Sequence, residues 1–452
     1  MGVPARSTYH CDLAWLGGDH AVAEVTIEID DDRIVAVTPG SAAPPEAIRL
    51  RGLTLPGLAN AHSHAFHRAL RGRTHGGVGS FWTWRDQMYG LAGRLDPDSY
   101  HRLARATFAE MAMAGVTCVG EFHYLHHQPD GTPYRDPNVV GQALVAAAAD
   151  AGVRITLLDT CYLRGGIDQA PEPVQRRFSD VVVDRWVERA DAMVGWRSPH
   201  VRIGAAVHSV RAVDPDSIAE VAGWASLRGV PLHAHVSEQP AENHACVEAY
   251  ALTPTELLSE RGALDAHFTA VHATHLTEHD VRLLQTHRSS VCMCPTTERD
   301  LADGIGPTAA LADAEVPLAL GTDSHAVIDL FEEARAIELD ERLASLVRGT
   351  HTVDSLLAAA TADGHRSLGW ADAGRITVGH VADLVTVRLD SVRTAGTSPA
   401  HALATVVFAA TAADVDHVIV GGRPVVRDGA HLYVDVAAEL AAAITAVWRE
   451  AT

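Results

Sequence analysis

The chain has 452 residues, 47% of them hydrophobic and 21% charged, and a formal net charge of −21 at pH 7. This length exceeds one average domain and allows a large core, while the acidic balance without a basic tract argues against nucleic-acid binding. No apolar run is long enough to span a membrane, so we expect neither a nucleic acid nor a membrane as a partner.

The N-terminus lacks the basic, apolar and small-residue pattern of a secretion signal, so we expect a cytoplasmic protein. The six cysteines form neither a disulfide framework nor a Cys-x-x-Cys metal pair. All 36 basic residues are arginine. The lack of lysine excludes Schiff-base chemistry on lysine, a Walker-type phosphate loop and a carbamylated lysine that bridges two metals.

Both ends of the chain predict β structure. Residues 23–29 alternate between apolar and polar, three aspartates follow as a turn, and residues 34–37 are again apolar. Residues 382–387 and 418–425 have the same character. We therefore predict one small β-sandwich domain built from residues 1–54 and 375–452, with a C-terminal helix.

The middle of the chain alternates between helix and strand patterns. Helices are predicted at 99–114, 140–151, 183–194, 217–227, 255–261, 278–286 and 307–314, followed by strands at 116–122, 153–159, 201–207, 230–236, 268–271, 290–294 and 316–321. With the strand that leads to His62, this makes eight strands. The pattern predicts an α/β protein with a closed (β/α)8 TIM-type barrel over residues 55–374. The alternative, an open doubly wound sheet, would need a Gly-rich first turn, which is absent.

Histidines and other reactive side chains gather at the ends of these strands, where barrel enzymes carry their active sites. His62 and His64 stand at i and i+2, so they point to the same side of an extended strand. Six of the eight strand ends carry such groups: His62 and His64; Glu121, His123 and Tyr124; His208 and Arg211; His233, His235 and Glu238; His272 and His275; and Asp323. We therefore predict a metal site at this end of the barrel.

Three histidines and one carboxylate would bind a divalent ion and leave a position for water. We choose His62, His64, His235 and Asp323 as the ligands. His233 shares a strand face with His235, so spacing alone does not separate them, and we assign His233 a structural role. The expected cofactor is one divalent ion, Zn²⁺, with Fe²⁺ as the alternative, because histidine and carboxylate ligands accept both.

The ordered motifs resemble those of the amidohydrolase superfamily. They are Pro56-Gly57-Leu58 leading to His62-x-His64, His235-x-x-Glu238, His272, Gly321-Thr322-Asp323-Ser324, the run from Gly374 to Gly379, and Ala382-Asp383-Leu384-Val385. They extend over nearly the whole chain. His-x-x-Glu after the fifth strand, in a chain without lysine, resembles the mononuclear deaminase branch of that superfamily.

Within this branch the chain resembles the formimidoylglutamate deiminases of histidine degradation. The resemblance rests on residues 61–66, on Phe-Trp-Thr-Trp-Arg at 81–85, on Glu-Phe-His-Tyr at 121–124 and on residues 208–213. It implies hydrolysis of N-formimino-L-glutamate to N-formyl-L-glutamate and ammonia, and a homodimer. It also implies substrate-binding positions at Arg85, Tyr124, His208 and Arg211, and at His67, where glutamine is expected instead.

The expected substrate carries two carboxylates, for which the guanidinium groups of Arg85 and Arg211 are suited. In the hypothetical mechanism the metal activates water, Asp323 accepts a proton, Glu238 carries a proton to the departing nitrogen and His272 orients the water or polarises the reacting centre. Glu238 could instead only orient a ligand. The competing functions are another amidohydrolase-type deaminase, acting on a purine, pyrimidine or thioadenosine, and a non-catalytic barrel.

Overall fold

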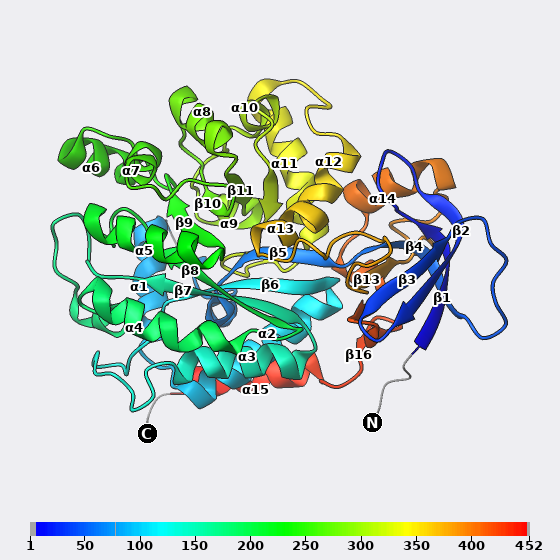
Figure 1. The fold of residues 1–452 in the computed structure, drawn as a ribbon, viewed down its shortest axis with the longest axis horizontal. Coiled ribbons are helices and arrows are strands. Elements are labelled where there is room, and N and C mark those ends of the chain that lie inside the picture. Colours follow the sequence, from blue (N-terminus) through cyan, green and yellow to red (C-terminus); the bar gives the residue numbers. More distant parts are fainter. Residues whose placement is uncertain (1–5, 77, 450–452) are drawn as a thin grey trace.

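The computed structural model describes residues 6–76 and 78–449, whose strands form two separate eight-stranded sheets. One sheet forms the barrel, and the other lies at its side (Figure 1). Residues 1–5 and 450–452, the outermost parts of the predicted terminal domain, lie outside the described residues, as does Gly77. Among the described residues, no helix is both long enough and apolar enough to cross a bilayer.

The barrel strands are all parallel and follow one another in chain order. They are β5 (Leu58–Ser63), β6 (Val116–His123), β7 (Arg154–Cys161), β8 (Val201–Val207), β9 (Leu232–Val236), β10 (Phe268–His272), β11 (Ser290–Met293) and β12 (Leu318–Leu320). A parallel bridge between Ser63 and Asp323 closes the ring. The predicted (β/α)8 barrel is thereby confirmed, and the open doubly wound sheet is excluded.

Helices cover the outside of the barrel, as the connections between parallel strands require. They are α1 (Phe81–Ala92), α2 (Pro97–Met113), α3 (Val139–Ala151), α4 (Val183–Met193), α5 (Pro215–Arg228), α6 (Pro240–Tyr250), α7 (Pro254–Glu260), α8 (Glu278–His287), α9 (Pro295–Asp300), α10 (Thr308–Asp313), α11 (Leu330–Ser345), α12 (Val353–Ala358) and α13 (Gly364–Ser367). Local signals set their ends. Asp96 caps α2 by accepting a hydrogen bond from the Ser99 amide at 2.7 Å, and Gly152 ends α3 with a left-handed φ of 77°.

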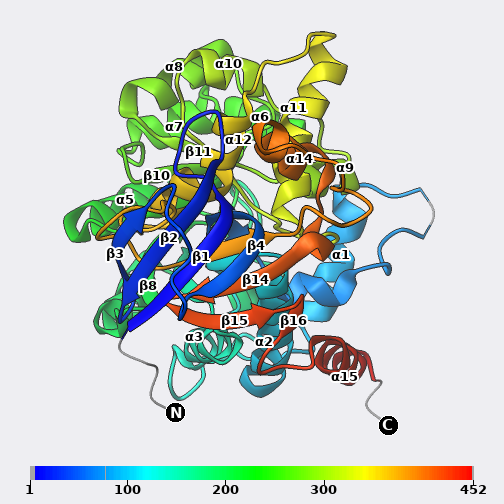
Figure 2. The same cartoon turned by 90° about the vertical axis from the view of Figure 1, so that its right-hand side faces the viewer.

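The second sheet joins both ends of the chain, with blue N-terminal strands beside orange and red C-terminal ones (Figure 2). In spatial order it contains β16 (Ala430–His431), β15 (Arg423–Arg427), β14 (Val415–Val420), β13 (Leu384–Val387), β4 (Ile48–Pro56), β1 (Arg6–Ala14), β2 (Val22–Asp30) and β3 (Arg33–Thr38). The prediction that both termini contribute to one β structure is thereby confirmed, and the described strands form a single mixed sheet where a β-sandwich was predicted. Since β4 ends at Pro56 and β5 begins at Leu58, this sheet leads directly into the first barrel strand.

The last helices lie close to the barrel. Helix α14 (Ala402–Ala409) packs against α11, and α15 (Val436–Trp448) packs against α2. The indole nitrogen of Trp448 donates to the Ala69 carbonyl at 2.9 Å, and Arg105 pairs with Glu439 at 3.2 Å. The division into residues 55–374 and a composite terminal domain remains a prediction.

Candidate metal centre and active site

The closure of the barrel brings the first and last strands' polar side chains together. The side-chain nitrogen Nδ2 of Asn60 donates to Thr322 Oγ1 at 2.7 Å, and Oδ1 of Asn60 accepts from the backbone amide of Thr322 at 3.0 Å. Gly321 allows this approach, because a Cβ there would lie 2.7 Å from His62 Cβ. The residues that follow each strand, His64 and Asp323, are therefore held side by side.

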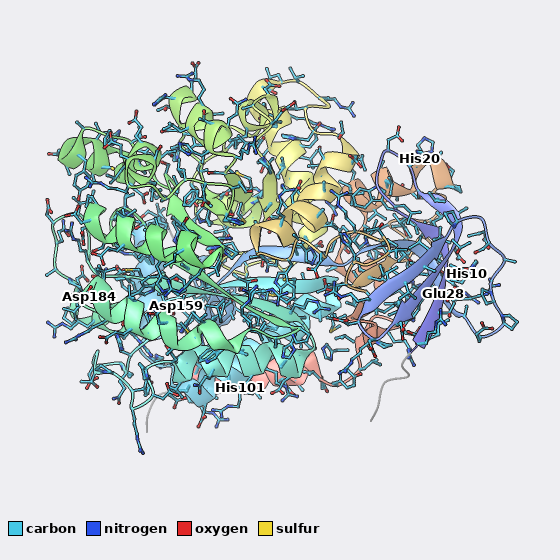
Figure 3. All side chains as sticks on the ribbon, viewed as in Figure 1. His10, His20, Glu28, His101, Asp159 and Asp184 are labelled. Carbon is cyan, nitrogen blue, oxygen red and sulfur yellow. The ribbon has the colours of Figure 1, made fainter. Side chains whose placement is uncertain are left out.

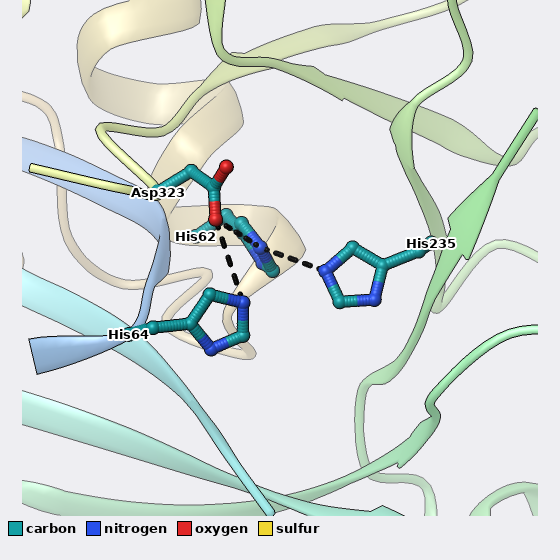
Figure 4. Close-up of side chains that lie close together, drawn as sticks. All are labelled: His62, His64, His235 and Asp323. Atoms are coloured by element: carbon teal, nitrogen blue, oxygen red, sulfur yellow. Dashed lines mark hydrogen bonds and ion pairs between the residues drawn. The ribbon is translucent and has the colours of Figure 1, made fainter. Parts of the chain in front are cut away.

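Four side chains at the strand ends form a compact group of potential metal ligands (Figure 4). His62, His64, His235 and Asp323 each offer one ligand atom, and the four atoms lie within 4.8 Å of one another. Asp323 Oδ1 lies 3.3 Å from His62 Nε2 and 3.4 Å from His64 Nε2. The Nε2 atoms of His62 and His235 are 3.2 Å apart. The structure thus brings together the four predicted ligands.

The donor atoms fit a divalent cation. Nδ1 of His64 lies 3.0 Å from the Phe122 carbonyl, and Nδ1 of His235 lies 2.8 Å from the His208 carbonyl. A carbonyl only accepts, so both Nδ1 atoms carry the proton and both Nε2 atoms present lone pairs to the centre. Converging lone pairs beside a carboxylate repel one another unless a cation lies among them.

The protonation states agree with this fit. Burial lowers the pKa of all three imidazoles, and that of His64 and His235 falls well below the ordinary histidine value. Burial opposes ionisation of Asp323, but His62 and His272 hold the pKa of its carboxyl well below the usual range. Neutral imidazoles and an ionised carboxylate are the forms that bind metal.

Strained backbone shapes the strand ends around this group. Ser237 has a φ of 51°, His272 of 66°, Ala273 of 51° and Asp323 of 38°, all in the left-handed region that favours glycine. Such conformations cost about 1–3 kcal/mol each and gather at functional sites. Here they turn the chain at the ends of β9, β10 and β12, so that the following side chains enter the site.

A pocket opens directly onto the ligand group. Of the predicted site residues, His62 is fully buried behind the others; those that line the pocket are His64, His67, Arg85, Tyr124, His208, Arg211, His235, Glu238, His272 and Asp323. The sequence did not reveal the remaining lining residues, which include Tyr89 of α1, Tyr162 after β7, Phe178 of η2 (Pro173–Phe178) and Leu301 after α9. Aromatic side chains thus make up much of the wall.

Glu238 and His272 form the acid–base part of the pocket. Glu238 Oε1 lies 3.8 Å from His272 Nε2, which is 3.9 Å from Asp323 Oδ2. Burial raises the pKa of the Glu238 carboxyl to about 7. Burial alone would lower the pKa of His272, but the negative charges of Glu238 and its neighbours hold it well above the ordinary value. A carboxyl group with a pKa near neutrality can both take up and release a proton at physiological pH.

The two predicted arginines differ in their surroundings. Arg211 Nε donates to Glu242 Oε2 at 2.8 Å, so an internal carboxylate already offsets part of its charge. Arg85 lies over the rings of Trp82 and Tyr89, with its guanidinium carbon 4.6 and 5.3 Å from their centroids. Within the described residues it has no carboxylate within 4.0 Å, and its buried Nε has no hydrogen-bond partner.

The remaining predicted residues, His67, Tyr124 and His208, line the same pocket. His67 Nε2 lies 3.2 Å from the Tyr124 hydroxyl, and burial lowers the pKa of His67 to about 3, so its ring is neutral. The His208 ring packs edge-on against Tyr124 and Tyr162. His67, where the resemblance predicts glutamine, therefore offers one donor and one acceptor to the pocket wall.

Other polar residues noted in the sequence lie outside the pocket. Glu121 accepts hydrogen bonds from Ser63 Oγ at 2.6 Å and from the Ala65 amide at 2.8 Å, and so fixes the chain on both sides of His64. His233 Nε2 donates to the Ser367 carbonyl at 2.9 Å. These contacts give Glu121 and His233 structural partners away from the ligand group.

A second buried group contains His123, His126 and Asp159, whose potential ligand atoms also lie within 4.8 Å of one another. Asp159, labelled in Figure 3, belongs to β7. Arg189 of α4 forms ion pairs with Asp159 and, at 2.8 Å, with Asp180. Because a guanidinium already supplies the cation, we assign this group to stability.

Replacing Arg189 by methionine is expected to lower the free energy of unfolding by about 3–5 kcal/mol, because two buried carboxylates lose their counter-ion. Urea unfolding followed by circular dichroism measures the change. Arg282→Met removes a solvent-exposed ion pair with Glu278 and serves as the control, with an expected change below about 0.5 kcal/mol. A loss below about 1 kcal/mol for Arg189→Met would contradict the assigned role.

Fold and site together define a metal-dependent hydrolase of the (β/α)8 barrel class. The model of the amidohydrolase family matches residues 53–425, and the chain belongs to this family. The resemblance noted in the sequence is thereby confirmed.

Two curated relatives align with most of the chain. A formimidoylglutamate deiminase of Pseudomonas aeruginosa is 35% identical over 421 residues, which cover 90% of this chain and 92% of the relative. A 5-methylthioadenosine/S-adenosylhomocysteine deaminase of Natronomonas pharaonis is 30% identical over 411 residues, covering 90% and 89%. The chain is thus similar to family members that are named for different substrates.

Solved structures agree with the fold. An amidohydrolase from Brucella melitensis superimposes with a TM-score of 0.90 at 29% identity, covering 98% of this chain and 100% of the other. An adenosine deaminase from Xanthomonas campestris with bound zinc gives a TM-score of 0.84 at 26% identity, covering 97% of each chain.

Proposed function

We propose that this protein is a deiminase that hydrolyses N-formimino-L-glutamate to N-formyl-L-glutamate and ammonia. The observation that carries the proposal is a single pocket that combines the ligand group with two arginines. One of them, Arg85, has no carboxylate partner among the described residues. Its guanidinium is half-buried over Trp82 and Tyr89, where it can pair with an anionic group of the substrate. The similarity to a formimidoylglutamate deiminase supports the same substrate.

His62, His64, His235 and Asp323 would hold one divalent ion, which we propose to be zinc. When bound, the ion supplies Lewis acidity that makes hydroxide available from water near neutral pH. Asp323 Oδ1 faces the histidines and Oδ2 faces His272. Oδ2 is therefore free to accept the proton that the water loses.

Glu238 is the proposed proton carrier. Water adds to the formimino carbon and loses one proton on addition and the second as the carbonyl forms. Glu238 passes both protons to the terminal nitrogen, which leaves as ammonia when the C–N bond breaks. His272 Nε2 lies between Glu238 and Asp323, where it can donate a hydrogen bond to the oxygen that develops charge. The two carboxylates of the substrate would pair with Arg85 and Arg211.

Ammonia release by the purified, zinc-loaded protein tests this function. N-Formimino-L-glutamate is the expected substrate, and guanine, cytosine, adenosine and 5-methylthioadenosine are the comparison compounds. A kcat/KM at least 100-fold higher for the first compound is expected. Turnover of a nucleobase or nucleoside instead would keep the hydrolytic site and reject the substrate, and no turnover with any of them would favour a non-catalytic barrel. The cytoplasmic location and the homodimer stay predictions.

A further inference from the structure

We propose that Glu298 is a positioning residue that fixes the orientation of the His272 ring. The proposal rests on the proposed function for its kinetic readout, but its geometric basis concerns the chain alone. Glu298 belongs to the short helix α9, beyond the end of β11, and only 4% of it is exposed. Its side chain does not line the pocket, so it acts through His272 rather than on a substrate.

A strained bend of the backbone brings the His272 side chain to the site but leaves the orientation of its ring open. His272 ends β10 with a φ of 66°. Its ring stacks on that of His235 with a centroid separation of 5.6 Å and an angle of 13°. Stacking fixes the plane of the ring but does not determine which nitrogen faces the pocket.

Glu298 determines which nitrogen of His272 faces the pocket. Its Oε1 lies 3.4 Å from His272 Nδ1, on the side of the ring away from Glu238 and Asp323. An ionised carboxylate only accepts hydrogen bonds, so Nδ1 is held as the donor. Nε2 is then the nitrogen that faces the reacting centre, in the way that a carboxylate behind a metal-bound imidazole fixes the orientation of its ring.

The carboxylate of Glu298 is itself held in place. Oε1 also accepts a hydrogen bond from the Cys294 amide at 2.9 Å, and the Glu298 amide donates to the Cys294 carbonyl at 3.0 Å. These bonds tie the side chain to the backbone where β11 passes into α9. They also define the competing role, in which Glu298 only stabilises the first turn of α9.

Two substitutions separate these roles. Glu298→Ala removes the acceptor, and Glu298→Gln keeps an acceptor oxygen for both Nδ1 and the Cys294 amide. Glu333→Gln is the matched control, because Glu333 is also buried and accepts from the Thr296 amide of α9 at 2.9 Å without contacting His272. Metal content and urea unfolding are measured for each variant.

We expect Glu298→Ala to lower kcat about 10- to 100-fold, with KM within about twofold and metal content unchanged. Glu298→Gln should recover most of this loss, and Glu333→Gln should retain full turnover. Unchanged kcat in Glu298→Ala, or an equal loss in Glu333→Gln, would overturn the proposal.

Nitrogen-15 NMR of the zinc-loaded protein gives a readout without any substrate. The Nδ1–H signal of His272, assigned by its absence from His272→Gln, should be present in the unaltered protein and in Glu333→Gln. It should be lost or shifted in Glu298→Ala. An unchanged signal in Glu298→Ala would overturn the proposal even if N-formimino-L-glutamate proved not to be the substrate.

Discussion

Glu238→Gln is expected to lower kcat by about 10³-fold while the protein keeps its metal. Glutamine has nearly the same shape as glutamate, but it cannot take up and release a proton. General acid–base catalysis contributes about 10²- to 10⁴-fold, and a carboxyl group with a pKa raised to about 7 by burial is suited to it. Steady-state ammonia release and metal analysis of the same preparation measure both quantities.

The alternative role for Glu238, orientation of a metal ligand, predicts a different pattern. Loss of an orienting contact lowers metal affinity or activity by about 10- to 100-fold, and glutamine would preserve part of it. Glu338→Gln is the control for removing a buried carboxylate, because Glu338 of α11 accepts hydrogen bonds from the backbone amides of Gly349 and His351. Turnover near that of the unaltered protein would reject the proton carrier, and loss of metal together with activity would favour the orienting role.

The barrel was predictable because its strands are short apolar runs that alternate with helices, a pattern of sequence alone. Helix α1 was less visible. Its stretch at 81–85 contains three aromatic residues, of which two, Phe81 and Trp84, line the pocket. The Ser80 amide bonds Thr83 Oγ1 at 2.9 Å, a start signal that was present but weak.

The site was predictable where a polar residue directly ends a strand, and less so elsewhere. The ends of β7 and β11 carried no predicted site residue, yet a residue after each of them lines the pocket or contacts His272. Tyr162 directly follows β7. It was predictable as a pocket residue, because predicted site residues directly follow other barrel strands in the same way. Glu298 stands four residues after Cys294 and enters through a helical turn, so its approach to His272 depends on a fold of the chain that spacing does not reveal.

The sequence also does not show which charged side chains form ion pairs with one another. The sequence presented Arg85 and Arg211 as equivalent cations, whereas Glu242 pairs with one of them alone. Glu242 lies 31 residues from Arg211, and its other oxygen accepts from the Ser237 amide at 3.2 Å. Only the three-dimensional structure separates the free guanidinium from the neutralised one, and this difference assigns the larger binding effect to Arg85.

Replacing Arg85 by methionine is accordingly expected to lower kcat/KM for N-formimino-L-glutamate by about 100-fold, mainly through KM. Methionine keeps apolar contact with Trp82 and Tyr89 but leaves a substrate carboxylate without its partner. Truncating one side of a buried charge pair costs about 2–5 kcal/mol, and a factor of 100 corresponds to about 2.8 kcal/mol. Initial rates over a range of substrate concentrations separate KM from kcat.

A substrate lacking one carboxylate tests whether this loss comes from the proposed contact. N-Formimino-4-aminobutyrate keeps the reacting group and one carboxylate. If Arg85 binds the missing carboxylate, Arg85→Met should lower kcat/KM for this compound by less than about threefold, because the interaction is already absent. Arg94→Met, which removes another aromatic-stacked arginine over Trp448, should affect neither substrate. Equal losses for both substrates would show that Arg85 does not bind the carboxylate that this compound lacks.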